Sequence, residues 1–237
     1  MVAELNLGGM SVDVVFKDIK NVHLSVHPPT GRVRIAAPAR MKLEAVRVFA
    51  ISKLDWIKKQ QSKLQAQDRE SPREYLERES HYLWGSRYLL QIVEGERPSG
   101  VASKHRTIVL TVPPNATTEK RRQIVEAWYR AEMKAALEPL IAKWENRLGL
   151  RVERAYIQKM KTKWGSSNPR LRHIRLNLEL AKKPSRCLDY VVLHEMMHFL
   201  VPDHSERFVA LMDHHQPGWR TVRQMLNEAP LTHVEWP

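Results

Sequence analysis

The chain has 237 residues, of which 43% are hydrophobic and 27% are charged, a composition typical of a globular protein. It excludes collagen-like, low-complexity and wholly disordered chains, and the length suits one large domain or two small ones. The apolar runs are only a few residues long, so we expect no membrane-spanning segment and no membrane partner. The start of the sequence does not resemble a signal peptide, and a single cysteine, Cys187, excludes an internal disulfide. Both features favour the cytoplasm.

Basic residues are distributed unevenly along the chain. Lys and Arg number 39 against 26 Asp and Glu, which gives a formal net charge of +13. Residues 151–186 contain 11 basic and 2 acidic residues, whereas residues 188–237 contain 3 basic and 7 acidic ones. This contrast predicts a polyanionic partner such as nucleic acid, or an acidic substrate, near residues 151–186. The alternative is a solvated basic face that only maintains solubility.

The first half of the sequence predicts a β-rich N-terminal region, residues 1–115, with one helix. Alternating apolar residues predict short strands within residues 11–37, and apolar residues at helical spacing predict a helix over residues 41–66. The polar residues 65–72 predict a linker between elements. Further strands are predicted at residues 82–93 and 107–112.

The second half, residues 116–237, is predicted to form a second region, which is richer in helices. A long helix is expected over residues 118–148, ended by Gly149, with Pro139 kinking or splitting it. Two strands are predicted to follow, at residues 152–160 and 171–178, joined by a loop through residues 164–169. A helix is predicted after them, over residues 184–200. Strands that precede helices in this way indicate an α+β fold.

The last of these helices carries the sequence His194-Glu195-Met-Met-His198. Two histidines four positions apart project from one face of a helix, so both imidazoles can reach one metal ion. The glutamate beside the first histidine then lies next to a metal-bound water, where a general base is needed. The motif therefore predicts a metal-dependent hydrolase.

A third histidine, His204, supplies the remaining ligand that a catalytic zinc site requires. It follows the second histidine by six positions, and a continuous helix would carry it away from the ion. Pro202 predicts that the chain turns there, and Asp203 with Glu206 predicts a capping box that opens a new helix. His204 is then expected in the first turn of that helix. Three neutral ligands and one open position are typical of catalytic rather than structural zinc.

The group that stabilises the oxyanion, or otherwise contacts the substrate, stays open at this point. Zinc peptidases often place a hydrogen-bond donor beside the cleft. Four residues are candidates for this role: His173, Tyr190, Arg207 and Trp164.

Three further residues that can bind metals are not expected at the site. His214 and His215 follow His204 by ten and eleven positions on one helix, so they would lie roughly 15 Å along its axis. Cys187 lies two helical turns before His194 and is expected to pack in the core.

Several segments carry a resemblance to a known family: 36–38, 56–57, 82–85, 164–166, 174–177, 189–195 and 204–208. The chain resembles the YgjP-like metallopeptidase family, which is related to the SprT-like zinc proteases within the zincin group. The resemblance implies one zinc ion held by His194, His198 and His204, with Glu195 as the base. It also implies that residues 116–237 form a zincin-like metallopeptidase region, preceded by the β-rich N-terminal unit. The active-site helix of this region is expected to pack on a small antiparallel or mixed sheet.

Two positions depart from related patterns. Metzincins share the three-histidine spacing but have glycine where this chain has Val201, so the chain is not assigned to them. The YgjP-like family often has cysteine where this chain has Ser167, so no thiol ligand is expected there.

The predicted function is that of a zinc metallopeptidase acting on a peptide or protein substrate. The resemblance to zincins implies that an edge strand aligns the substrate by main-chain pairing, and residues 171–178 are the candidate because they precede the active-site helix. The alternative is a nucleic-acid-associated zinc protein, bound through residues 151–186, whose hydrolase activity is secondary or lost. The sequence predicts neither the oligomeric state nor the natural substrate.

Overall fold

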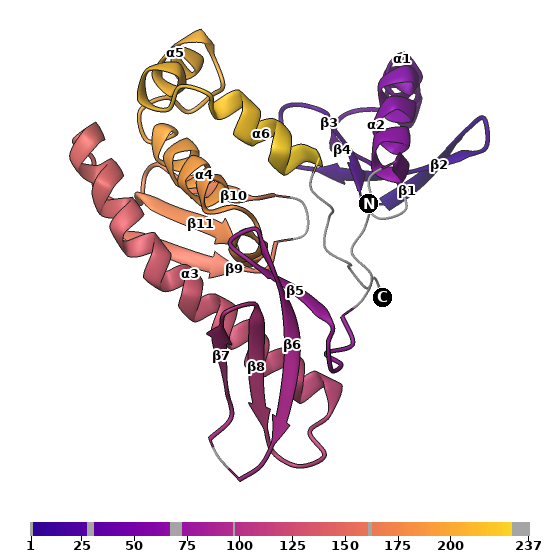
Figure 1. The fold of residues 1–237 in the computed structure, drawn as a ribbon. Coiled ribbons are helices and arrows are strands. Elements are labelled where there is room, and N and C mark those ends of the chain that lie inside the picture. The colour runs from indigo at the N-terminus through magenta and orange to yellow at the C-terminus, as the bar shows by residue number, and fades with distance from the viewer. Residues whose placement is uncertain (1, 28–30, 67–72, 97, 161–162, 229–237) are drawn as a thin grey trace. The chain divides into compact units, whose positions relative to one another are not determined.

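The computed structural model describes residues 2–27, 31–66, 73–96, 98–160 and 163–228. They form an α+β fold, as predicted, and divide into two compact units, one up to residue 70 and one from residue 71 to 228 (Figure 1). The predicted linker at residues 65–72 lies mostly outside the described residues. None of the described helices is both long and apolar enough to cross a membrane.

The first unit is a four-stranded sheet accompanied by two helices. The strand order is β1-β2-β4-β3, and alternate apolar side chains such as Val12, Val14 and Ile35 are fully buried. The helix predicted over residues 41–66 is two helices, because the chain leaves helical geometry at Lys53. The elements are β1 (Val2–Leu7), β2 (Met10–Lys17), β3 (His23–His27), β4 (Arg32–Pro38), α1 (Leu43–Ser52) and α2 (Leu54–Ala66).

The second unit contains two sheets, a short 3₁₀ helix and four α-helices. Its first sheet has the order β5-β6-β8-β7, with β5 (Ser80–Leu83), β6 (Ser86–Glu94), β7 (Gly100–Lys104) and β8 (Thr107–Val112). Its second sheet has the order β10-β11-β9, with β9 (Arg154–Gln158), β10 (Gly165–Asn168) and β11 (His173–Asn177). The helices are α3 (Thr118–Leu148), η1 (Leu178–Lys182), α4 (Ser185–Met197), α5 (Glu206–His215) and α6 (Trp219–Glu228).

The long helix α3 connects the two sheets of this unit. The Thr117 hydroxyl accepts a hydrogen bond from the Lys120 amide at its start, and Gly149 ends it in the left-handed conformation, φ 62°. Pro139 does not split it. Its buried side chains share one core with β8, β11 and α4, so β5–β8 belong to the second unit. The compact units therefore differ from the division predicted after residue 115.

The small mixed sheet on which α4 packs has an edge that the sequence did not predict. The segment predicted as a loop, residues 164–169, contains β10, which pairs antiparallel with β11. Strand β9 pairs parallel with β11 on the other side. The predicted edge strand, residues 171–178, is thus the central strand, and β10 is the edge nearer α4.

The β5–β6 turn lies against the start of α4. The Trp84 amide donates to the Ala181 carbonyl at 2.8 Å. Gly85 has φ 82°, and a Cβ there would lie 2.9 Å from Cγ of Pro184. A glycine is required at this turn both by its backbone angle and by the close approach.

Candidate metal centre

Three histidines converge at the end of α4. His194 and His198 lie one helical turn apart, and His204 comes from the segment that returns before α5. One ring nitrogen from each lies within 4.8 Å of the others, and the Nε2 atoms of His194 and His204 are 3.0 Å apart. The predicted three ligands are therefore brought together by the fold.

The route of the chain to the third histidine differs in detail from the prediction. Helix α4 ends at Met197, and the chain turns before Ser205, the residue that precedes α5. His204 lies before the helix rather than in its first turn. The predicted capping box does not form. Ser205 occupies the N-cap position without a side-chain cap, and it donates hydrogen bonds to the Asp203 carboxylate.

The donor set fits a divalent transition metal. The Nδ1 of His198 lies 3.1 Å from the Val201 carbonyl, which fixes that ring and leaves its Nε2 for a ligand bond. Burial lowers the pKa of His194 to about 3 and also lowers the pKa of His198. Both rings are thus neutral at physiological pH, the form that binds metals.

Glu195 lies beside this cluster in a confined position. It is buried, and the side chain of Ser167 on β10 forms a hydrogen bond to it. Burial raises the pKa of Glu195 to about 7, while the Ser167 bond and the charge of Lys163 oppose that rise. A carboxyl group with this pKa exchanges a proton readily near neutral pH.

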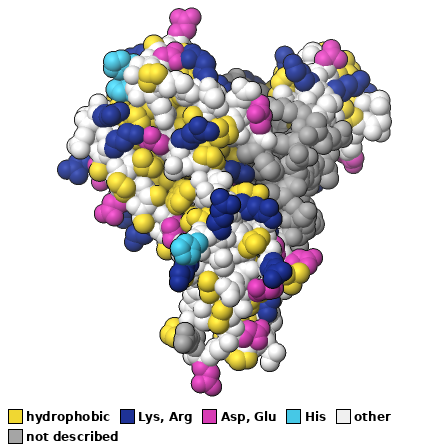
Figure 2. Space-filling view, in the orientation of Figure 1, with side chains coloured by type: hydrophobic (Ala, Val, Ile, Leu, Met, Phe, Trp, Pro, Cys, Tyr) yellow, Lys and Arg dark blue, Asp and Glu magenta, His cyan; other side chains and the backbone are white. Residues whose placement is uncertain are grey.

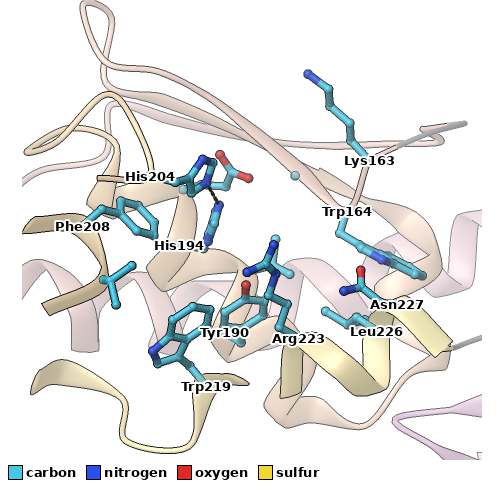
Figure 3. A pocket seen from close by; sticks show the side chains of 14 residues that line it. Lys163, Trp164, Tyr190, His194, His204, Phe208, Trp219, Arg223, Leu226 and Asn227 are labelled. Carbon is cyan, nitrogen blue, oxygen red and sulfur yellow. Dashed lines mark hydrogen bonds between the residues drawn. The ribbon is translucent and has the colours of Figure 1, made fainter. Parts of the chain in front are cut away.

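A pocket of about 450 Å³ opens next to Glu195, His194 and His204 (Figure 3). One wall is aromatic: Tyr190 on α4 and Trp219 on α6 are stacked, with ring centroids 6.2 Å apart and planes 5° apart. Trp164, just before β10, also lines it. The pocket has room for side chains or short stretches of an extended chain.

The structure separates the four predicted substrate contacts into two groups. Tyr190 and Trp164 line the pocket. His173 does not: it begins β11 opposite Asn168. Arg207 is exposed on α5 and does not line the pocket either.

Trp219 and Arg223 are among the pocket residues that were not predicted from the sequence. Trp219 and Arg223 lie one turn apart on α6, which packs against α4. No motif marks α6, although an arginine four positions after a tryptophan on the last described helix is a pattern that could have drawn attention to this face.

The remaining candidate ligands are outside the cluster, as predicted. His214 and His215 lie in the last turn of α5 and contact each other. Cys187 is fully buried, with its Sγ 3.8 Å from the sulfur of Met225. In the described residues, the three-histidine cluster is the only group of three or more such ligands that could hold a metal.

Comparison with protein families identifies the chain. A family model described as YgjP-like, metallopeptidase domain, matches residues 20–229, most of the sequence. The chain belongs to the YgjP-like metallopeptidase family. The membership implies a metal-dependent peptidase, and the histidine cluster of this YgjP-like chain is a site that could hold its ion.

This YgjP-like protein was also compared with curated proteins and with solved structures. No curated protein matches it. Among solved structures it is similar to the metallopeptidase zymogen jannalysin of Methanocaldococcus jannaschii, with 18% identity and a TM-score of 0.35. That match covers 38% of this chain and 87% of the jannalysin chain.

Proposed function

We propose that this protein is a zinc metallopeptidase that hydrolyses peptide bonds with one zinc ion per chain. The observation that carries the proposal is the convergence of three imidazoles beside a buried carboxyl group. Nitrogen ligands of this kind suit zinc, and three of them leave a position for water and substrate. A bound zinc ion would polarise the scissile carbonyl and lower the pKa of the attacking water.

Two side chains near the proposed zinc site supply the proton transfer and the stabilisation of the oxyanion. Glu195 takes a proton from the attacking water and later delivers it to the leaving amine. Burial raises the pKa of Tyr190 to about 12, so its hydroxyl keeps its proton at neutral pH. Because Tyr190 lines the pocket one turn before His194, its hydroxyl can donate a hydrogen bond to the oxyanion.

Strand β10 is suited to align an extended substrate. The Asn177 amide donates to the Trp164 carbonyl at 2.9 Å, so these two residues form a hydrogen-bonded pair. Bonded and non-bonded pairs alternate in an antiparallel ladder, so Gly165 and Ser167 direct their main-chain groups away from β11. A peptide can add to this edge beside Glu195.

Glu195→Gln is the variant that tests the proposal. Glutamine is nearly isosteric but cannot accept the proton, so we expect metal content and fold to persist while peptide hydrolysis falls by at least about a hundredfold. The matched control is Glu206→Gln, an exposed glutamate at the start of α5 outside the pocket. Full activity of Glu195→Gln would remove this residue from the mechanism.

We further propose a cytoplasmic location, consistent with the single buried Cys187. Nucleic acid remains a proposed second partner of residues 151–186. The observation in its favour is that Arg170 and Arg172 are both exposed in the turn between β10 and β11.

A further inference from the structure

Arg223 reaches into the pocket from α6. Its guanidinium lies 5.9 Å from the ring centroid of Trp219, which itself stacks on Tyr190. In the view of Figure 3 the side chain extends alongside Tyr190, between His194 and Trp164. The aromatic wall thus holds a planar cation within the same pocket as the histidine cluster.

Arg223 has no partner for its charge within the part of the chain that the structure describes. It makes no hydrogen bond and no ion pair there; its guanidinium lies near the ring of Trp219, and its charge also acts on Tyr190 and His194. Arginine presents five donors in a fixed fork, which matches a carboxylate in a bidentate arrangement. A guanidinium that forms no ion pair and lines a pocket is available to bind a ligand.

The charges around the pocket favour an anionic ligand. Among the described residues that line it, Lys163 is a second cation without an ion pair, and Glu195 is the sole carboxyl group. Glu195 forms no ion pair with either cation, although the charge of Lys163 acts on it. A negatively charged group of the substrate would therefore meet two cations that are not held in ion pairs.

We propose that Arg223 binds a carboxylate of the peptide substrate, so that the enzyme prefers peptides carrying an acidic side chain or a free C-terminus near the scissile bond. This inference rests on the proposed peptidase function and names its substrate class. Both carboxylate sources share the same chemistry, a planar anion that accepts two hydrogen bonds from one guanidinium. Arg223 is thus a specificity residue.

Arg220 on the same helix provides the matched control. It also lies over the ring of Trp219, at 4.7 Å from the centroid, but it pairs with Asp213, Nη2 to Oδ2 at 3.0 Å. It does not line the pocket. Replacing it therefore removes the same type of side chain from the same helix while leaving the pocket charges intact.

The experiment measures peptide binding separately from peptide cleavage. Binding is measured by calorimetry with zinc-loaded Glu195→Gln protein and blocked hexapeptide mixtures that contain either Glu or Gln at each position in turn. A second arm compares mixtures with a free or an amidated C-terminus. Cleavage of the same mixtures by protein with Glu195 intact is followed by mass spectrometry. Each measurement is repeated with Arg223→Gln, Arg223→Lys and Arg220→Gln.

We expect the carboxylate-bearing mixtures to bind about tenfold more tightly than their neutral counterparts, which corresponds to about 1.4 kcal/mol. Arg223→Gln should abolish this difference, Arg223→Lys should retain part of it, and Arg220→Gln should leave it unchanged. The arm that shows the difference identifies the source as an acidic side chain or the C-terminus. Circular dichroism checks that the variants are folded.

The outcomes separate this inference from the proposed function. Cleavage without any preference for carboxylates, or a preference that survives Arg223→Gln, overturns the role of Arg223 and leaves the peptidase intact. A binding preference that depends on Arg223, without cleavage by protein with Glu195 intact, supports the carboxylate site and overturns the proposed hydrolysis.

Discussion

Gly165 lies directly against Glu195: a β-carbon on Gly165 would lie 2.5 Å from Oε1 of Glu195 and 2.8 Å from its Cγ. It would also lie 2.8 Å from Cγ1 of Val191. The edge strand and the active-site helix can approach this closely only because residue 165 has no side chain. The position of the proposed base is therefore fixed in part by a residue with no functional group.

Gly165→Ala should displace Glu195 and lower peptide hydrolysis by roughly a hundredfold, since a shift of about 1 Å at a reacting group has an effect of that size. Zinc content should persist because the three histidines are untouched. The control is Gly100→Ala, since nothing lies within 4 Å of a Cβ there. Unchanged kcat in Gly165→Ala would show that β10 and α4 can move apart without loss of peptide hydrolysis.

His204→Ala should reduce zinc affinity by more than roughly tenfold, because even loss of an outer-shell partner has an effect of that size. The fold should survive, since His204 is exposed and lies outside any helix. Metal analysis after dialysis against a weak chelator measures the change. His214→Ala, an exposed histidine outside the cluster, should retain full occupancy. Retention of zinc by both variants would exclude His204 as a ligand.

Asp189→Ala should destabilise the second unit by about 1–3 kcal/mol, the range for leaving donors without their acceptor. Asp189 on α4 accepts hydrogen bonds from the Trp144 indole at 2.6 Å and the Lys143 ammonium at 2.8 Å, both on α3. Urea unfolding followed by tryptophan fluorescence measures the loss. The control Glu138→Ala removes an exposed carboxyl group from α3 and should change stability by less than about 0.5 kcal/mol.

DNA binding by the basic segment should weaken steeply with salt, as counterion release requires. Two lysines of the segment are left out of the test. Lys159 forms an ion pair with Glu126, and Lys161 lies outside the described residues. The double variant Arg170→Gln/Arg172→Gln should lower the slope of log K against log salt by about 2.

The control for the arginine double variant is Lys58→Gln/Lys59→Gln, which replaces two exposed lysines on α2. On the face drawn in Figure 2, basic side chains are interspersed with acidic ones rather than gathered into one large patch. Absence of binding at low salt, or equal slopes for the two double variants, would favour the solvated-face alternative.

The sequence predicted the centre of the site because its signal is local. A helix alone places His194 and His198 on one face with Glu195 beside them, so spacing is sufficient. His204 required a chain reversal, which Pro202 indicated. Its exact setting, before α5 rather than inside it, depends on which residue takes the cap.

The parts that were missed depend on tertiary packing. Strand β10 has the sequence Gly-Ser-Ser-Asn, without apolar alternation, and is a strand because β11 pairs with it. Arg223 reaches the pocket only because α6 packs on α4, which no spacing within α6 reveals. The compact units differ from the predicted division because β5–β8 share their core with α3.

The close approach of Gly85 to Pro184 has a consequence for how the metal centre is assembled. The turn that precedes β6 contacts the chain at the start of α4. The orientation of α4, which carries two of the metal ligands, therefore depends on a hairpin far earlier in the sequence. A fragment that begins at residue 116 would keep every metal ligand and the base. It would lack the contact between the β5–β6 turn and the start of α4, and it would expose the apolar side chains of α3 that β8 covers. The ligands would then have to be ordered by the ion alone, at the expense of its binding free energy.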